Sequence, residues 1–175
     1  MTNKLIHMSL LKKIIIDFRL NSFSSFVVLF CYRVSNFIYI NNPSLLKLWR
    51  GVEYVIRFLL HLDAQISAKA KIGTNIRLLH RGQGVVISAK AIIGDYVTIY
   101  HQVTVGINEG LPKDFQTIYI DDHCYLSAGS KVISCHLGEN SKVGPNAVAY
   151  RDTPPNSLIV LDVVYKHNYY SQEKV

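Results

Sequence analysis

The sequence has 175 residues, of which 49% are hydrophobic, and a formal net charge of +7. This length fits one compact domain, or one domain with a helical appendage, with enough apolar residues for a sizeable core. The positive charge favours an anionic partner, either a phosphate-bearing molecule or an acidic membrane surface. Charge is the sole argument for nucleic acid, because the tyrosines and basic residues do not form a stacking platform, so we expect no nucleic-acid binding.

The three cysteines, Cys31, Cys124 and Cys135, show no CxxC spacing. That pattern favours a reducing compartment over a disulfide framework or a structural zinc site. The first twenty residues lack the order of charges and apolar residues of a signal peptide. The apolar segment 26–40 contains Arg33 and is shorter than the roughly 20 residues needed to span a bilayer. We therefore expect a cytoplasmic protein without a transmembrane helix, either free or at the inner face of the membrane.

Residues 1–62 carry apolar residues at helical spacing and predict two or three amphipathic helices. The clearest runs through residues 45–59, after a turn in which Ser44 is the expected N-cap. The favoured role of these helices is a cap or an oligomer interface. Peripheral contact with an anionic leaflet is the alternative, because the segment is rich in basic residues. These are Lys12, Lys13, Arg19, Arg33, Lys47, Arg50 and Arg57.

From Ile66 the period changes, and aliphatic residues recur mostly six apart, usually with a small or β-branched residue four positions later. The aliphatic series is Ile66, Ile72, Leu78, Ile87, Ile93, Ile99, Val105, Ile120, Leu126, Val132, Leu137 and Val143. A period of six fits neither an α-helix nor a simple alternating strand. It fits a parallel β-helix, in which like residues stack coil upon coil. We expect this mainly-β domain to span residues 63–150, followed by a C-terminal tail over residues 151–175.

Three interruptions of the period predict departures from the regular coil. Three extra residues follow Leu78, a protruding loop spans residues 107–117, and a shorter slip falls at residues 132–136. His80 lies at the first interruption, beside Arg81 and Gln83. An imidazole at a solvent-facing bend is the usual general base for a hydroxyl group. His101 is expected on the outer wall, either lining an acceptor pocket, holding a cofactor group or serving as surface decoration.

The pattern [LIV]-[GAS]-x-x-[small]-x resembles the hexapeptide-repeat acyltransferases, whose fold is a left-handed parallel β-helix. Within that superfamily, "AKIG" at 70–73, the His-x-Gly-x-small-Val-Val-Ile element at 80–87 and "VTVG" at 103–106 resemble the serine acetyltransferase branch. The sequence resembles more closely the relatives of that branch that O-acetylate exopolysaccharides, such as the colanic-acid acetyltransferases. The resemblance implies an acetyl-CoA-dependent O-acetyltransferase, with His80 as the catalytic base and direct transfer of the acetyl group.

Departures from the serine enzymes point towards a sugar acceptor. Gln65 stands where the serine enzymes carry the aspartate that orients the histidine, Leu79 replaces a second aspartate, and Thr117 lies where a second histidine is expected. Towards the C-terminus, Leu161 and Val163 replace the glycine and proline of a turn beside the coenzyme. We therefore expect transfer to a sugar hydroxyl in capsule or exopolysaccharide assembly, with the loop selecting the acceptor. The acceptor-site candidates are His101, Gln65, Arg81 and Gln83.

By the same resemblance, the coenzyme is expected between neighbouring β-helices of a homotrimer, which the N-terminal helices join into a dimer of trimers. Small residues are expected to let the pantetheine arm approach the backbone, and two lysines to hold the phosphates. These residues are Gly106, Ser127, Ala128, Gly129, Lys131 and Lys142. His123 and His136 bring zinc into consideration, because trimeric β-helix carbonic anhydrases use histidines, but no close His-x4-His pair occurs and we expect no metal.

Two other functions stay open. Serine O-acetylation is the alternative enzyme, against which the departures at Gln65, Leu79 and Thr117 count. A β-helix without catalytic activity that scaffolds a polysaccharide complex at the membrane surface is the alternative of another class.

Overall fold

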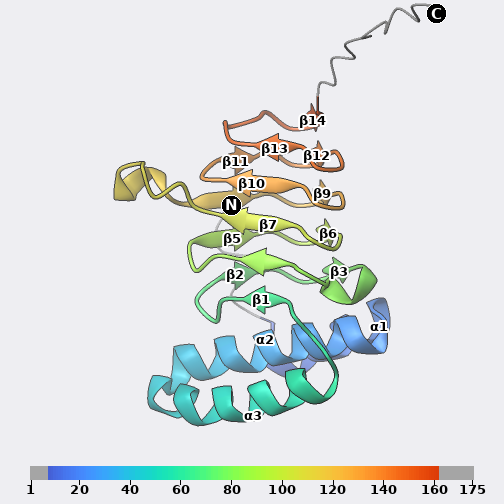
Figure 1. The fold of residues 1–175 in the computed structure, drawn as a ribbon, viewed down its shortest axis with the longest axis vertical. Coiled ribbons are helices and arrows are strands. Elements are labelled where there is room, and N and C mark those ends of the chain that lie inside the picture. Colours follow the sequence, from blue (N-terminus) through green and yellow to red (C-terminus); the bar gives the residue numbers. More distant parts are fainter. Residues whose placement is uncertain (1–7, 162–175) are drawn as a thin grey trace, which may run out of the picture.

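A layer of helices lies at one end of a solenoid of short strands (Figure 1). The computed structural model describes residues 8–161. The helices are α1 (Leu10–Leu20), α2 (Phe23–Asn41) and α3 (Leu46–Leu59), as the helical spacing predicts. Ser44 does not cap α3, because it lies inside a 3-10 turn over Pro43–Leu45 and its hydroxyl donates to Asn42 Oδ1 at 2.6 Å.

The solenoid consists of three parallel sheets, one on each face of a prism. Sheet A contains β1 (Gln65–Ile66), β4 (Val86–Ile87), β7 (Thr104–Gly106), β10 (Lys131–Ile133) and β13 (Val148–Ala149). Sheet B contains β2 (Lys71–Ile72), β5 (Ala91–Ile93), β8 (Ile118–Ile120) and β11 (His136–Leu137). Sheet C contains β3 (Arg77–Leu78), β6 (Thr98–Ile99), β9 (Tyr125–Leu126), β12 (Lys142–Val143) and β14 (Leu158–Ile159). The predicted parallel β-helix is confirmed.

The hexad columns form the core. Every aliphatic residue of the predicted series is buried, and the register stacks Ile66 on Ile87 and Ile87 on Val105 in sheet A. Where a hexad has a small or β-branched residue four positions later, as at Ala70, Val97 and Ala147, that residue is also buried, because the chain turns a corner there and little room remains for a larger side chain. Short strands therefore suffice, since each coil buries its apolar residues against the next.

The first two interruptions lie between strands, and the third spans the end of β10 and the start of β11. The first is a tight turn over His80–Gly82 between β3 and β4, and the second contains a 3-10 turn over Lys113–Phe115 between β7 and β8. At the third, Ser134 takes a φ of 45° between β10 and β11. The solenoid continues beyond the boundary expected at residue 150, because Thr153 bridges to Leu137 and β14 pairs with β12. Residues 162–175 of the expected tail lie outside the described chain.

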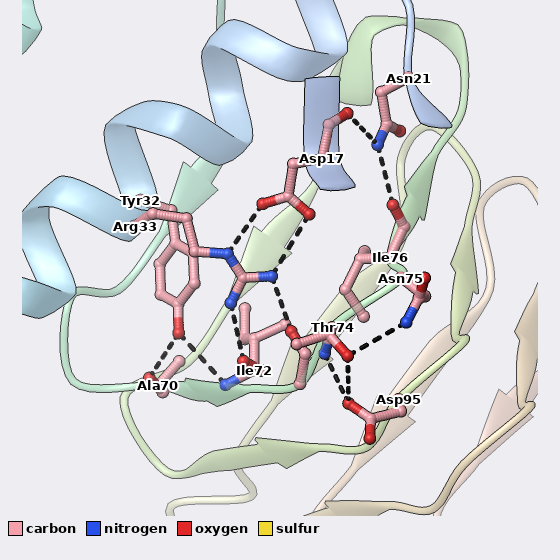
Figure 2. A network of polar contacts seen from close by, with 11 residues as sticks. Asp17, Asn21, Tyr32, Arg33, Ala70, Ile72, Thr74, Asn75, Ile76 and Asp95 are labelled. Carbon is pink, nitrogen blue, oxygen red and sulfur yellow. Dashed lines mark hydrogen bonds and ion pairs between the residues drawn. The ribbon is translucent and has the colours of Figure 1, made fainter. Parts of the chain in front are cut away.

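The helical layer is bound to the first coil by buried polar side chains (Figure 2). Arg33 Nε on α2 donates to Asp17 Oδ2 on α1 at 2.8 Å, and both side chains are almost fully buried. The guanidinium also donates to the carbonyl oxygens of Ile72 at 2.8 Å and Gly73 at 2.6 Å. Since a buried cation needs both a counter-ion and hydrogen-bond acceptors, Arg33 is satisfied on both counts.

Other side chains of α1 and α2 complete this contact. The Tyr32 hydroxyl donates to Ala70 O at 2.9 Å and accepts from Ile72 N at 3.2 Å. Asn21, which follows α1, donates to Ile76 O at 2.9 Å and accepts from Leu78 N at 2.7 Å. The backbone groups of the first coil that have no preceding strand are thus paired with helix side chains.

One described helix, α2, is long and apolar enough by length and composition to cross a membrane. In the fold it is the inner helix of the layer, since it contacts both α1 and α3. Its buried face includes Arg33 and Ser35 together with Val28, Leu29 and Tyr32. The arrangement of α2 is therefore that of a core helix held between the other helices and the first coil.

Candidate active site

His80 stands at the corner where the chain passes from sheet C to sheet A. Three consecutive residues, His80, Arg81 and Gly82, have φ values of 51°, 64° and 64°. A Cβ at Gly82 would lie 2.6 Å from the Leu78 side chain, so this left-handed turn requires glycine there. The turn leaves the His80 side chain exposed, which a base for an external hydroxyl requires.

His101 occupies the same corner one coil further on. The imidazole rings of His80 and His101 meet edge to face, with their centroids 4.8 Å apart. The Nδ1 atom of His101 is buried and has no hydrogen-bond partner among residues 8–161. The structure therefore brings the predicted base and the predicted acceptor-site histidine into contact, although 21 positions separate them in the sequence.

Two tyrosines continue this cluster across sheet C. The Tyr100 ring lies 5.7 Å from the His80 ring and 5.3 Å from the Tyr125 ring, measured between centroids. Partial burial, reinforced by the neighbouring Tyr100, raises the pKa of Tyr125 to about 12. Tyr125 is therefore a neutral phenol at physiological pH and is suited to hydrogen bonding and not to accepting a proton from a substrate.

The predicted coenzyme residues Ser127, Ala128 and Gly129 lie at the same corner of the solenoid as His101, one coil further on. Gly129 N donates to His101 O at 3.0 Å, so the two corners are neighbours along the solenoid. Gly129 has a φ of 69°, and a Cβ there would collide with the Asn146 side chain. The fold itself therefore requires glycine at position 129. Ser127 and Ala128 are small and half-buried, and the fold places no such requirement on them.

The remaining coenzyme candidates are divided between two faces. Gly106 and Lys131 lie on adjacent strands of sheet A, and the Lys131 ammonium donates to Gly129 O at 3.1 Å. A Cβ at Gly106 would meet its neighbours no closer than 3.4 Å, so packing within the chain leaves room for a larger residue there. Lys142 lies on sheet C, paired with Tyr125, so the two lysines do not share a face.

The acceptor candidates other than His101 do not gather at His80. Gln65 on β1 lines a groove of about 480 Å³ between α3 and sheet A, which His80 does not line. The Arg81 guanidinium donates to Leu60 O at 2.8 Å, which holds the turn against the end of the helical layer. Gln83 is exposed, and its carbonyl accepts from Gln102 N at 2.7 Å, so its backbone ties successive corners together.

The protruding loop leaves the solenoid at a different corner, between sheets A and B. Figure 1 shows it on the opposite side of the solenoid from the turn after β3. With residues of the adjoining strands it lines a second groove of about 440 Å³ that includes Phe115, Thr117 and His136. Within one chain, therefore, the loop does not reach His80.

Sequence reasoning missed Arg77, which lies on β3 three residues before His80. Arg77 is exposed and makes no side-chain hydrogen bond or ion pair among residues 8–161. The register aligns it with Thr98 and then Tyr125 on the outer face of sheet C, and its charge acts on the Tyr125 phenol. Counting six-residue steps outward from the hexad columns would have placed this cation beside the histidine corner.

No group of three or more metal-ligating side chains occurs within residues 8–161. His123 is exposed and stacks on Tyr96, with 4.9 Å between ring centroids. His136 Nε2 lies 2.9 Å from Asp121 Oδ2, and both side chains are exposed. The two histidines considered as zinc ligands thus lie in separate surroundings.

The chain is similar in sequence to bacterial serine acetyltransferases. It is 33% identical over 143 residues to that of Mycobacterium tuberculosis, covering 76% of this chain and 60% of the relative. It is 34% identical over 133 residues to that of Helicobacter pylori, covering 75% of this chain and 74% of the relative. The chain belongs to the serine acetyltransferase family. This membership places it in the hexapeptide-repeat acyltransferase superfamily, as the repeat pattern suggests.

Solved structures of the serine acetyltransferase family share the fold. The soybean enzyme complexed with serine superposes with a TM-score of 0.67 at 27% identity, covering 81% of this chain and 56% of the other. The Brucella abortus enzyme in complex with coenzyme A gives a TM-score of 0.66 at 20% identity, covering 80% and 54%. No family model matches the chain. This member of the family spans between about half and three quarters of the length of such relatives.

The comparisons do not support the exopolysaccharide branch suggested by the sequence. The curated relatives named above are serine acetyltransferases. They favour the alternative acceptor, serine, over the sugar hydroxyl. Of the residues on which the sugar hypothesis depended, Leu79 directly precedes His80, whereas Gln65 and Thr117 line two grooves that do not include His80.

Proposed function

We propose that this protein is an acetyl-CoA-dependent O-acetyltransferase whose acceptor is the hydroxyl group of serine. The observation that carries the proposal is His80, exposed on a rigid left-handed turn in a chain of the serine acetyltransferase family. His101 and Tyr100 contact its ring and restrict its orientation.

In the proposed reaction, the His80 imidazole removes the proton from the serine hydroxyl as its oxygen attacks the thioester carbonyl of acetyl-CoA. A carbon–oxygen bond forms and the carbon–sulfur bond breaks, which gives O-acetylserine and the coenzyme thiolate. The proton held by His80 passes to that sulfur, so the imidazole is restored for the next turnover. Proton transfer through a positioned side chain of this kind contributes about 100 to 10,000-fold to the rate.

The proposed coenzyme path follows sheet A away from the histidine corner. Packing within the chain leaves space beside Gly106, and the small side chains of Ser127 and Ala128 allow the coenzyme to approach the backbone at the corner. Lys131 lies on the same sheet and supplies positive charge for a phosphate. We assign Lys142 no coenzyme role, because it lies on sheet C, and Val163 of the changed C-terminal turn lies outside the described residues.

The separation of the loop from His80 within one chain supports a site that two copies share. If the chains assemble as a closed trimer, the loop of one copy can cover the histidine corner of another. The loop residues Leu111 and Phe115 are exposed, so they are available for such a contact. A homotrimer is therefore part of the proposal, with the loop excluding water and selecting the acceptor.

Serine carries a carboxylate, which a neutral sugar lacks, so a cation near His80 would favour serine as the acceptor. Arg81 and Arg77 are the two candidates for this cation. The Arg81 guanidinium already donates a hydrogen bond to Leu60 O. Arg77 is exposed on sheet C, which also carries Tyr125, and lies three residues before His80. We therefore propose that Arg77 receives the serine carboxylate, because a guanidinium binds a carboxylate through two parallel hydrogen bonds. A sugar acceptor would gain nothing comparable from this cation.

The test is the release of free thiol from acetyl-CoA by the full chain, with L-serine or a panel of neutral glycans as acceptor. We expect serine-dependent release, with O-acetylserine identified by mass spectrometry. His80→Ala should reduce kcat by about 100 to 10,000-fold. His123→Ala is the matched control, because His123 is also an exposed histidine that contacts an aromatic ring but lies at another corner. The activity of this variant should equal that of the wild type.

The outcomes separate the candidate functions. Glycan-dependent release with no response to serine would replace serine by a sugar while leaving the role of His80 intact. Full activity in His80→Ala would remove the proposed base. A chain that neither releases thiol nor binds coenzyme A in calorimetry would be the scaffold considered from the sequence, and the proposed function would be wrong.

A further inference from the structure

The outer side of α3 carries a continuous apolar stripe that nothing in the described chain covers. Leu48, Val52, Val55 and Leu59 follow one another at steps of three and four residues, so they share one side of the helix, and Leu45 of the preceding 3-10 turn comes three residues before them. All are exposed, with Leu48 at 73% and Leu59 at 68% of their full accessible area. Isolated exposed leucines are ordinary, but an ordered row along four turns requires an explanation.

The fold does not need this stripe to hold α3 in place. The inner side of the helix is attached through polar contacts: Trp49 Nε1 donates to Ser35 Oγ at 2.7 Å, and Ser35 Oγ donates to Glu53 Oε2 at 3.0 Å. Ile56 and Leu60 pack against the core from the same side. No residue of α3 is fully buried, so its apolar content greatly exceeds what its own packing uses.

The outer side of α1 repeats this feature. Leu11, Ile15 and Phe18 lie at steps of four and three residues and are all exposed. Phe18 also meets Phe26 of α2 edge to face, with ring centroids 5.1 Å apart, so the exposed ring is held in place. Figure 1 shows α1 and α3 in the same layer at the end of the solenoid, away from the later coils. The two exposed stripes therefore belong to one end of the molecule.

The charges of this layer restrict the partner. Between residues 9 and 60 there are two carboxylates, and both are used internally: Asp17 pairs with Arg33, and Glu53 with Arg57 at 2.8 Å. The exposed charged side chains of that segment are therefore all cations. They are Lys12, Arg19, Lys47 and Arg50, of which Arg50 lines the groove between α3 and sheet A.

The same layer of a second copy is a poor partner, because the contact would bring like charges together and neither layer has an exposed carboxylate to neutralise them. Nucleic acid would use the cations but would leave the aliphatic stripes in water. A surface that is both apolar and negatively charged can contact the aliphatic stripes and neutralise the exposed cations. We propose that the outer sides of α1 and α3 form a docking surface for an anionic lipid bilayer.

The mode of binding is peripheral. The aliphatic and aromatic side chains of the stripes enter the boundary between headgroups and acyl chains, and the lysines and arginines contact the anionic headgroups. The helix α2 stays in its place, since moving it into lipid would strip Arg33 of Asp17 and of two backbone carbonyls. The solenoid would then stand on the membrane through its helical end, with its later coils pointing away.

The experiment is co-sedimentation of the full chain with vesicles of phosphatidylcholine alone or with about one third phosphatidylglycerol. We expect binding to the anionic vesicles that weakens as salt rises, and little binding to the neutral ones. Lys12→Glu with Lys47→Glu should weaken binding by at least about 25-fold, since each basic side chain near the surface contributes about fivefold. Leu48→Ser with Val55→Ser should also weaken it strongly while leaving the charge unchanged.

Matched controls come from the solenoid. Leu158→Ser removes a similarly exposed leucine from β14, and Lys71→Glu with Lys90→Glu changes the net charge by the same amount as Lys12→Glu with Lys47→Glu. Both controls should bind vesicles as the wild type does. The fluorescence of Trp49, the single tryptophan, checks that the helical layer is intact in every variant.

Two results would overturn the proposal. One is the absence of binding to anionic vesicles, or a loss that the solenoid controls share equally. The other is a change in the sedimentation coefficient of the lipid-free protein on Leu48→Ser with Val55→Ser, without vesicle binding by the wild type. That result would assign the stripe to contact between copies of the chain. None of these measurements depends on acetyl transfer.

Discussion

The rings of His80 and His101 meet edge to face at 4.8 Å although they come from successive corners of the solenoid. The buried Nδ1 of His101 has no partner among residues 8–161, so packing fixes this ring more than hydrogen bonding does. The ring of His101 therefore supports one side of the His80 imidazole. In the proposed reaction His101 is a positioning residue for the base.

Removing that support should slow the reaction. His101→Ala is expected to lower kcat about ten- to hundredfold, because small misplacements of a reacting group are costly. His101→Phe should recover most of the loss, since it keeps a ring against His80 without a titratable nitrogen. Steady-state kinetics with serine would check both variants. A phenylalanine variant as slow as the alanine variant would mean that His101 contributes a polar group and not a surface.

Arg77 should affect the affinity for serine more than the rate of transfer. Arg77→Gln removes the cation proposed to hold the carboxylate, and a hydrogen bond to a charged group is worth about 1.5 to 3 kcal/mol. The KM for serine should rise by about ten- to hundredfold, with kcat and the KM for acetyl-CoA nearly unchanged. Arg151→Gln, which removes an exposed arginine stacked on Tyr150, is the control. An unchanged KM for serine in Arg77→Gln would mean that Arg77 does not bind the serine carboxylate.

Two glycines should respond in opposite directions to the same substitution. Gly82→Ala places a Cβ 2.6 Å from Leu78 at a φ of 64°, and should destabilise the fold by about 1 to 3 kcal/mol and displace His80. Gly51→Ala on the outer side of α3 meets nothing within 4 Å and should stabilise it by about 0.5 to 1 kcal/mol. Thermal unfolding measures both. Equal effects would show that the turn at His80 tolerates a side chain.

The three cysteines should be inert in the native protein. Burial raises the pKa of the Cys31, Cys124 and Cys135 thiols to about 11. Native protein at pH 8 should therefore react with a thiol reagent far more slowly than denatured protein, in which all three are accessible. Rapid modification of any one thiol in the native state would contradict this burial.

The same thiols predict a loss of stability in alkali. The unfolded chain gives up these protons near the ordinary pKa of 9.0, whereas the folded chain holds them up to about 11. The folded state therefore binds more protons in that window, so stability is kept below pH 9 and falls as the pH rises towards 11. Melting temperatures recorded across this window test the prediction. Replacing Cys124 by alanine should reduce the slope, although the smaller side chain lowers the stability at every pH.

The ion pair between Asp17 and Arg33 should dominate the stability of the helical layer. Asp17→Asn leaves a buried guanidinium without its counter-ion and should cost about 3 to 5 kcal/mol in the free energy of unfolding. Asp63→Asn, at an exposed position, should change it by less than about 0.5 kcal/mol. Denaturant titration compares the two. A small effect of Asp17→Asn would mean that the carbonyls of Ile72 and Gly73 alone satisfy Arg33.

Much of the fold could be predicted because its determinant is local. A residue such as Ile93 or Leu126 is buried by its place in a six-residue period, which the sequence displays directly. The turn at His80 was visible as extra residues in that period. The pairing of Asp17 with Arg33 was not visible, because it joins two helices whose relative placement no periodicity records.

The site was predicted less completely, for a related reason. Hexad counting places His80 and His101 at corners, but it does not show that the rings touch or that Arg81 is held by Leu60. It also grouped Lys131 with Lys142, which share a chemical type and lie on different sheets. The choice of a sugar acceptor followed from single-residue departures in an aligned pattern, and the relatives favour serine.

The contact between the helices and the first coil gives the solenoid a direction of growth. Side chains of Tyr32, Arg33 and Asn21 occupy backbone groups that a preceding strand would otherwise use. No further coil can be inserted before β2 or β3 without displacing them. Duplication of hexads can lengthen such a molecule at its far end, beyond β14, while the end that carries the helices keeps the same length.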